Sequence, residues 1–310
     1  MDAHVAVLSN PTAGKGRARV AAVQAADALR IAGATLREYS GASVAETRML
    51  AAQALALAPA ALVVVGGDGT LSGILDIVCA SDVPVVVVPA GTGNDLARAL
   101  GLPLVDPAAA AIVALRGRTR RIDVGEVRSA DGTRLFLTVA ALGFDAKVSD
   151  RTDRLRWPRG QLRYYLALVI ELFRLRPMRF RMSIDGGAAT DAPGTLIAVG
   201  NTASYGGGMP MCVGAQPDDG RLDVVAVRPL GRLRLLRVFP RLLRGRHLDL
   251  PEVSHRRAQT VSVAAPDLVV YADGERVAHG ECVIALRASA LAVLVPVDGV
   301  PSVSSRPGDR

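Results

Sequence analysis

Up to about residue 120, short runs of apolar residues alternate with segments in which apolar residues recur at helical spacing. The apolar runs predict strands at residues 5–8, 61–65 and 84–88, and the periodic segments predict helices at 17–31, 44–57, 71–80 and 95–100. The strands ALVVV and PVVVV are apolar at every position, as a parallel sheet covered on both faces requires. Ser43 with Glu46 predicts a capping box, and Asp106 followed by Pro107 predicts another helix start. Residues 1–122 are therefore expected to form an α/β domain with a parallel sheet.

After Arg121 the pattern changes to strands separated by turns. Asp-Gly pairs at 131–132, 185–186, 219–220 and 273–274 predict hairpin-like turns. Two helical segments, at about 162–175 and 230–243, interrupt this pattern. Residues 123–290 are therefore expected to form a β-rich second domain, with a soft boundary near residue 122.

Composition narrows the class of partner. The formal net charge is +8, but Lys15 and Lys147 are the two lysines among 37 basic residues, and aromatic residues make up 4%. Nucleic-acid binding usually needs aromatic platforms among the basic residues, so a phosphate-bearing ligand or an anionic membrane is the better expectation.

The cysteines and the apolar segments indicate the compartment. Cys79, Cys212 and Cys282 are far apart and odd in number, which argues against a disulfide framework and a zinc site. The N-terminus has no secretory pattern, and the longest hydrophobic segment, 164–173, is about half the length that spans a bilayer. We expect a cytoplasmic protein with at most peripheral contact with the inner face of the membrane.

Three glycine-containing turns follow strands of the first domain: SNPTAGKG at 9–16, GGDGT at 66–70 and AGTGND at 90–95. Ligands of open α/β sheets bind at the carboxyl ends of the strands, and helix N-termini there favour phosphate. The first turn is not a dinucleotide fingerprint, and Lys15 is followed by Gly16, so it is not a Walker A motif either. The three turns predict a phosphate site of another kind.

Three acidic turns are candidates for chemistry, although each is also typical of an ordinary turn. Asp68 can belong to a tight turn, or it can orient Mg²⁺ or a water near a triphosphate. Taken alone, ADGE at 272–275 reads as a hairpin turn and DDGR at 218–221 as a solvated turn.

The motifs NPTAGKG, GGDGT and GTGNDLAR, in this order and spacing, resemble the catalytic domain of diacylglycerol kinases and related bacterial lipid kinases. The resemblance continues through NTASYGGGM at 201–209, PDDGRLDV at 217–224 and DGE at 273–275, and so covers nearly the whole chain. It implies an α/β domain like that of NAD kinases and lipid kinases, a β-rich, sandwich-like second domain and an active-site cleft between them. It also implies that a strand at 291–300 returns to the first domain. Residues 301–310 are expected to form a disordered tail.

The resemblance implies ATP and Mg²⁺ as cofactors, and it assigns roles to residues. Asp273 resembles the general base and Glu275 its acidic neighbour. Asp219, with the backbone carbonyls of Gln216 and Arg221, would hold a structural Mg²⁺, and Asp68 would join the reactive Mg²⁺ together with Asp95. The residues expected to contact the nucleotide are Asn10, Pro11, Thr12, Ala13, Gly14, Ser40, Gly66, Gly67, Asp68, Gly69, Thr70, Thr92, Asn94 and Asp95. Ser40 stands where related sequences often carry threonine.

The expected function is transfer of the γ-phosphoryl group of ATP to a lipid hydroxyl, with diacylglycerol as the first candidate acceptor. An NAD kinase-like enzyme and a catalytically silent nucleotide- or lipid-binding protein remain alternatives. The arginine-rich segment 228–247 can either pack between domains or rest on anionic lipid. A homodimer is implied by the resemblance alone.

Overall fold

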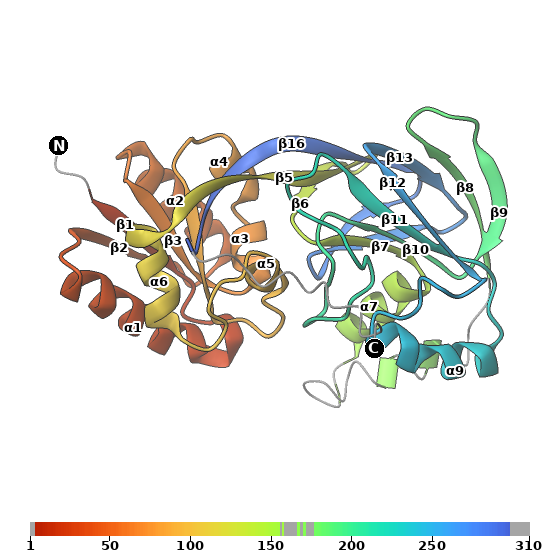
Figure 1. Ribbon diagram of the computed structural model, residues 1–310, viewed down its shortest axis with the longest axis horizontal. Coiled ribbons are helices and arrows are strands. Elements are labelled where there is room, and N and C mark those ends of the chain that lie inside the picture. The colour runs from red at the N-terminus through yellow and green to blue at the C-terminus, as the bar shows by residue number, and fades with distance from the viewer. Residues whose placement is uncertain (1–3, 156, 158–165, 168–169, 172–176, 298–310) are drawn as a thin grey trace, which may run out of the picture.

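The structure, a computed structural model, describes residues 4–155, 157, 166–167, 170–171 and 177–297 (Figure 1). Most of the helix predicted at 162–175 and all of the segment predicted to lack order at 301–310 lie outside these residues. Two domains lie side by side, and two long strands cross from one to the other. Among the described residues, no helix is long and apolar enough to cross a membrane.

The first domain is an α/β unit. Strands β1 (Val5–Ser9), β2 (Leu36–Ser40), β3 (Ala61–Gly66) and β4 (Val85–Pro89) pair in parallel in the order β2-β1-β3-β4. Every residue of β1, β3 and β4 is buried, as their continuous apolar runs predict. Helices α1 (Arg17–Ile31) and α6 (Pro107–Arg116) pack together, as do α2 (Val44–Ala56) and α4 (Leu75–Cys79), so the sheet is covered on both faces (Figure 1).

Local helix signals are confirmed at two starts. Ser43 Oγ accepts the N–H of Glu46 at the start of α2, and Asp106 accepts the N–H of Ala109 at the start of α6. The Glu46 carboxylate returns to the N–H of Ala42, one residue before the position a capping box requires.

Two predictions of local structure were wrong. The helix expected at 71–80 is divided into α3 (Asp68–Ser72) and α4, because Ile74, with a φ of −119° and a ψ of 9°, leaves helical geometry between them. The Asp219-Gly220 pair does not join two strands directly. It lies in the long connection between β10 (Leu196–Gly200) and β11 (Leu222–Val227), where the Gly220 N–H donates to the buried Asp123 carboxylate.

The second domain is a β-sandwich with helices on one outer face. Within the described residues one sheet has six strands in the order β12-β11-β10-β7-β14-β15. Along β10, Ile197 and Val199 pack into the core between the sheets, while Leu196 and Ala198 face α7 (Phe144–Arg154) and α9 (Arg232–Leu243). Alternate side chains of β10 therefore pack into two cores, one between the sheets and one between the six-stranded sheet and the helices. The bounds of the other strands in this sheet are β7 (Val139–Gly143), β12 (Val253–Ala258), β14 (Val269–Ala272) and β15 (Glu275–His279). The strands β6 (Gly132–Phe136), β8 (Met178–Ile184), β9 (Thr190–Gly194) and β13 (Thr260–Ala264) belong to the other sheet.

Strands β5 (Arg118–Ser129) and β16 (Cys282–Val295) form an antiparallel ribbon that connects the domains along one side (Figure 1). The first part of β16 pairs with β13 of the sandwich, and Val293 near its end pairs in parallel with Val85 of β4. Between these parts the register shifts, and the buried Asp123 carboxylate accepts the N–H of Ser289 in the bulge. One carboxylate thus fixes both the bulge and the loop that holds Gly220.

Candidate active site between the domains

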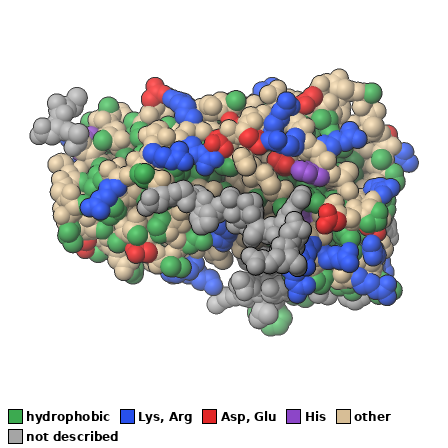
Figure 2. All heavy atoms as spheres, in the orientation of Figure 1, with side chains coloured by type: hydrophobic (Ala, Val, Ile, Leu, Met, Phe, Trp, Pro, Cys, Tyr) green, Lys and Arg blue, Asp and Glu red, His purple; other side chains and the backbone are tan. Residues whose placement is uncertain are grey.

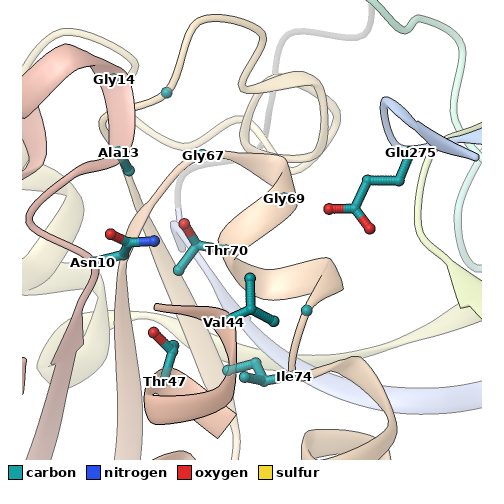
Figure 3. A pocket seen from close by; sticks show the side chains of 12 residues that line it. Asn10, Ala13, Gly14, Val44, Thr47, Gly67, Gly69, Thr70, Ile74 and Glu275 are labelled. Atoms are coloured by element: carbon teal, nitrogen blue, oxygen red, sulfur yellow. The ribbon is translucent and has the colours of Figure 1, made fainter. Parts of the chain in front are cut away.

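A cavity of about 280 Å³ opens at the carboxyl ends of the parallel strands. Asn10, Ala13 and Gly14 border it from the first glycine turn, and Gly67, Gly69 and Thr70 from the second (Figure 3). The carboxylate of Glu275 reaches toward the second turn from the other domain. The structure therefore brings all three glycine turns, the third through Gly91, and one predicted acidic residue of the β14–β15 turn to a shared cavity.

Glycine is required where these turns touch. A Cβ on Gly14, which has a φ of +60°, would lie 1.8 Å from the carbonyl oxygen of Ala90. A Cβ on Gly91 would lie 2.4 Å from the Cα of Gly67. The first and second turns thus both pack their backbones against the third. Backbone N–H groups of glycine turns at helix N-termini favour phosphate.

Arg17, at the start of α1, bonds to two of the turns. Its Nε donates to the Gly14 carbonyl at 3.1 Å, and a terminal nitrogen donates to the Gly91 carbonyl at 2.8 Å. Sequence reasoning missed Arg17, although a basic residue directly after a glycine turn and at a helix start is a usable signal. It missed Val44, Thr47, Gly73, Ile74 and Gly91 as well, all of which line the cavity.

Asp68 lies beside the cavity at the N-terminus of the short helix α5 (Asp95–Ala99). Its carboxylate accepts the N–H of Asp95 at 3.0 Å and the N–H of Leu96 at 3.2 Å. Burial raises the pKa of Asp68 above its ordinary value, and these two N–H bonds offset part of that rise. The carboxylates of Asp95 and Asp273 add to the rise, so the three acids form one electrostatic cluster.

Asp95 connects the domains. The buried carboxylate accepts the N–H of Gly207 and of Gly208, each at 2.7 Å, and the hydroxyl of Ser204 at 3.1 Å. These donors belong to the NTASYGGGM segment of the second domain, where positive φ angles at both glycines direct the N–H groups at one side chain. The acidic end of GTGND thus anchors the glycine-rich segment across the cleft.

Asp273 occupies the turn between β14 and β15 with a φ of +49°. Its Oδ1 accepts the N–H and the hydroxyl of Thr138, and its Oδ2 accepts the N–H of Leu137 and the hydroxyl of Ser72. Burial raises the pKa of Asp273, and the hydrogen bonds from Thr138, Leu137 and Ser72 hold back that rise. An aspartate with a raised pKa is a better proton acceptor than an exposed one.

Other predicted residues lie apart from the cavity lining. Pro11 and the exposed Thr12 belong to the first turn, where Asn10 Oδ1 accepts both the N–H and the hydroxyl of Thr12. Ser40 ends β2 beside Ser9, and Gly66 ends β3 against Thr70.

In the third turn, Thr92 is exposed, while Asn94 bonds to Gly91 through both atoms of its amide. Asn94 therefore shapes the third turn from within.

The predicted structural Mg²⁺ site gains no support from the geometry. One Asp219 oxygen forms an ion pair with Arg257, and the other accepts the N–H of Arg221. Gln216 is exposed. Among the residues described, no group of three or more His, Cys, Asp or Glu side chains is arranged to hold a metal ion. Arg257 and the Arg221 N–H thus engage both oxygens of Asp219, and the Mg²⁺ site at this turn stays a prediction.

Comparison with known proteins agrees with this arrangement. Residues 4–127 match the family model for the diacylglycerol kinase catalytic domain, and residues 138–295 match the YegS C-terminal NAD kinase beta sandwich-like domain. A diacylglycerol kinase of Mycobacterium tuberculosis is 43% identical over 296 residues, which cover 95% of this chain and 96% of that protein. A diacylglycerol kinase of Bacillus subtilis is 30% identical over 69% of this chain and 70% of its own.

A solved structure shares the fold. The crystal structure of a diacylglycerol kinase from Bacillus anthracis superposes with a TM-score of 0.73 at 20% identity, covering 96% of this chain and 98% of that one. The two family models together span nearly all of the described residues, and the chain therefore belongs to the diacylglycerol kinase family of lipid kinases.

Proposed function

We propose that this protein transfers the γ-phosphoryl group of ATP to the free hydroxyl of diacylglycerol and so produces phosphatidic acid. The observation that carries the proposal is the position of the β14–β15 turn. In this turn Glu275 lines the cavity opposite the glycine turns, and Asp273 accepts a hydrogen bond from Ser72 of the first domain. A candidate base and a candidate phosphate cradle therefore face one another across a single opening.

In this proposal ATP enters as its magnesium complex, with the phosphates on the N–H groups of the first two glycine turns. Asn10, Gly14 and Thr70 line that part of the cavity. The lipid hydroxyl approaches from the second domain. Positioning and neutralisation of charge supply most of the acceleration in phosphoryl transfer, which suits a site built of backbone groups and carboxylates.

Asp273 is proposed to accept the proton of the attacking hydroxyl. Its four hydrogen bonds occupy both oxygens, and the Ser72 hydroxyl, at 3.2 Å, is the longest of them. An acceptor hydroxyl that replaces Ser72 would donate to the same Oδ2 atom. As its oxygen bonds to the γ-phosphorus, the bond from that phosphorus to the β–γ bridging oxygen breaks, ADP leaves, and the proton remains on Asp273.

The relatives' names favour diacylglycerol over the alternatives. Both the Mycobacterium and the Bacillus subtilis proteins are named diacylglycerol kinases. An NAD kinase-like reaction would use the same glycine turns with a ribose hydroxyl as the acceptor. A silent binding protein would have no need of a carboxylate with a raised pKa beside the cleft, such as that of Asp273.

The test is an acceptor panel. ATP consumption and product formation are measured with Mg²⁺ and diacylglycerol, sphingosine, phosphatidylglycerol or NAD, the lipids in mixed micelles. Phosphatidic acid formation that needs diacylglycerol supports the proposal. Turnover with NAD alone would replace it with the NAD kinase-like reaction, and ATP binding without any turnover would leave a silent nucleotide-binding protein.

A further inference from the structure

Helix α9 carries apolar side chains on two opposite faces. Leu235 and Val238 are buried against α7 and the outer face of the six-stranded sheet. Leu233, Leu236 and Leu243 point away from that core, with 71%, 54% and 52% of their surface exposed. Their spacing of three and seven residues places these leucines on one stripe of the helix.

Arginines lie next to this leucine stripe. Residues 228–247 contain seven arginines and no acid. Arg234 is engaged by Glu252, and Arg228 donates to the Pro251 carbonyl. Within the described part of the chain, Arg237 and Arg241 have no ion-pair partner. Figure 2 shows Lys and Arg side chains gathered where Figure 1 places α9.

We propose that the outer face of α9, defined by Leu233, Leu236, Leu243, Arg237 and Arg241, docks on an anionic membrane surface. A helix that lies in the plane of a bilayer buries an apolar stripe at the headgroup boundary and directs flanking basic side chains to lipid phosphates. The combination of unpaired arginines with exposed leucines satisfies both requirements. The other side of α9 is already fixed in the core, so the docking face is held rigidly.

The positive charge on the outer face of α9 favours an anionic membrane over other partners. A second copy of the chain would bring another arginine-rich face to the contact, in a protein with a formal net charge of +8, so like charges would oppose self-association there. A nucleic acid would leave the exposed leucines in water, because sequence-tolerant binding uses aromatic platforms. An anionic leaflet matches the arginines and the leucines together.

The test is flotation of the full chain with vesicles in the absence of nucleotide, which keeps it independent of the proposed reaction. One set of vesicles is phosphatidylcholine alone, and the other includes about a third phosphatidylglycerol. The wild type is expected to float with the anionic vesicles and to dissociate as salt rises. Each lost arginine is expected to weaken partitioning about fivefold, so Arg237→Glu with Arg241→Glu should reduce it by roughly 25-fold or more.

Matched variants separate the docking face from general charge and apolarity. Arg37→Glu with Arg116→Glu makes the same change in net charge on the first domain and is expected to bind as the wild type. Leu236→Ser with Leu243→Ser should weaken flotation, whereas Val20→Ser with Val23→Ser should not, although Val20 and Val23 on α1 are equally exposed, at 60% and 58%. Circular dichroism confirms that each variant is folded.

Equal loss in the α9 and control variants would overturn the proposal, as would equal binding of all variants. Failure of the wild type to float with anionic vesicles would overturn it too. Two further results would assign the face to another occupant: binding of mixed-sequence RNA without binding of vesicles, or a dimer in sedimentation that the α9 variants dissociate.

Discussion

The hydroxyl of Ser72, at the end of α3 in the first domain, donates to Oδ2 of Asp273 in the second domain at 3.2 Å. In the proposed reaction the acceptor hydroxyl of the lipid takes this position. A serine hydroxyl thus lies where the substrate hydroxyl is expected. The bond also links the two domains at the point where they must admit the substrate.

Ser72→Ala should shift the acidic limb of kcat/KM to higher pH. The Ser72 hydrogen bond stabilises the ionised carboxylate and so lowers the pKa of Asp273, which burial raises. Loss of the bond raises the pKa further, and a base must be deprotonated to act. The measurement is the pH dependence of kcat/KM with diacylglycerol in micelles. Ser81→Ala, at a turn outside the cleft, is the control. An unshifted limb in Ser72→Ala would show that Asp273 does not set it.

Gly14→Ala should weaken ATP binding by about tenfold or more, because backbone strain of this kind costs about 1–3 kcal/mol and displaces the turn. The added Cβ would meet the Ala90 carbonyl at 1.8 Å, so the first and third turns would have to separate. Gly16→Ala is the matched control. Gly16 also has a positive φ, of +89°, but a Cβ there meets no atom within 4 Å. Titration with a fluorescent ATP analogue distinguishes the two variants, and equal affinities would contradict this account of the turn.

Asp95→Ala should loosen the two domains. The substitution leaves the N–H groups of Gly207 and Gly208 without their acceptor, and hydrogen bonds to a buried charge contribute about 1.5–3 kcal/mol each. We expect a lower urea midpoint and a larger radius of gyration in small-angle X-ray scattering.

Asp106→Ala provides the comparison for Asp95→Ala. It removes a helix cap worth about 1 kcal/mol in the first domain and should leave the scattering unchanged. Identical scattering from the wild type and Asp95→Ala would refute the role of Asp95 in joining the domains.

The regular elements of the first domain could be predicted because each carries its own signal. The continuous apolar runs of β3 and β4 specify buried parallel strands, and the period of 17–31 specifies α1. The division of 71–80 into two helices was less accessible. It depends on the backbone at Ile74, which leaves helical geometry at a position where the spacing of apolar residues gives no signal.

Local sequence does not distinguish Asp273 from Asp185. Both precede glycine in a hairpin, both have positive φ, at +49° and +48°, and both accept two backbone N–H groups from a neighbouring segment. The difference is topological. The β14–β15 turn faces the glycine turns of the first domain, while Asp185 lies in the β8–β9 turn of the sandwich. A family motif supplied the distinction for Asp273, and no such signal pointed to Thr47 or Ile74 in the cavity.

The most direct test of the central claim is phosphatidic acid formation by Asp273→Asn, with Asp185→Asn as the matched control and ATP affinity measured in parallel. Removal of a general base typically costs a factor of about 10² to 10⁴ in rate. We expect a loss of that size in Asp273→Asn, with ATP affinity near that of the wild type, and near-normal turnover in Asp185→Asn. Near-normal turnover in Asp273→Asn would contradict the account.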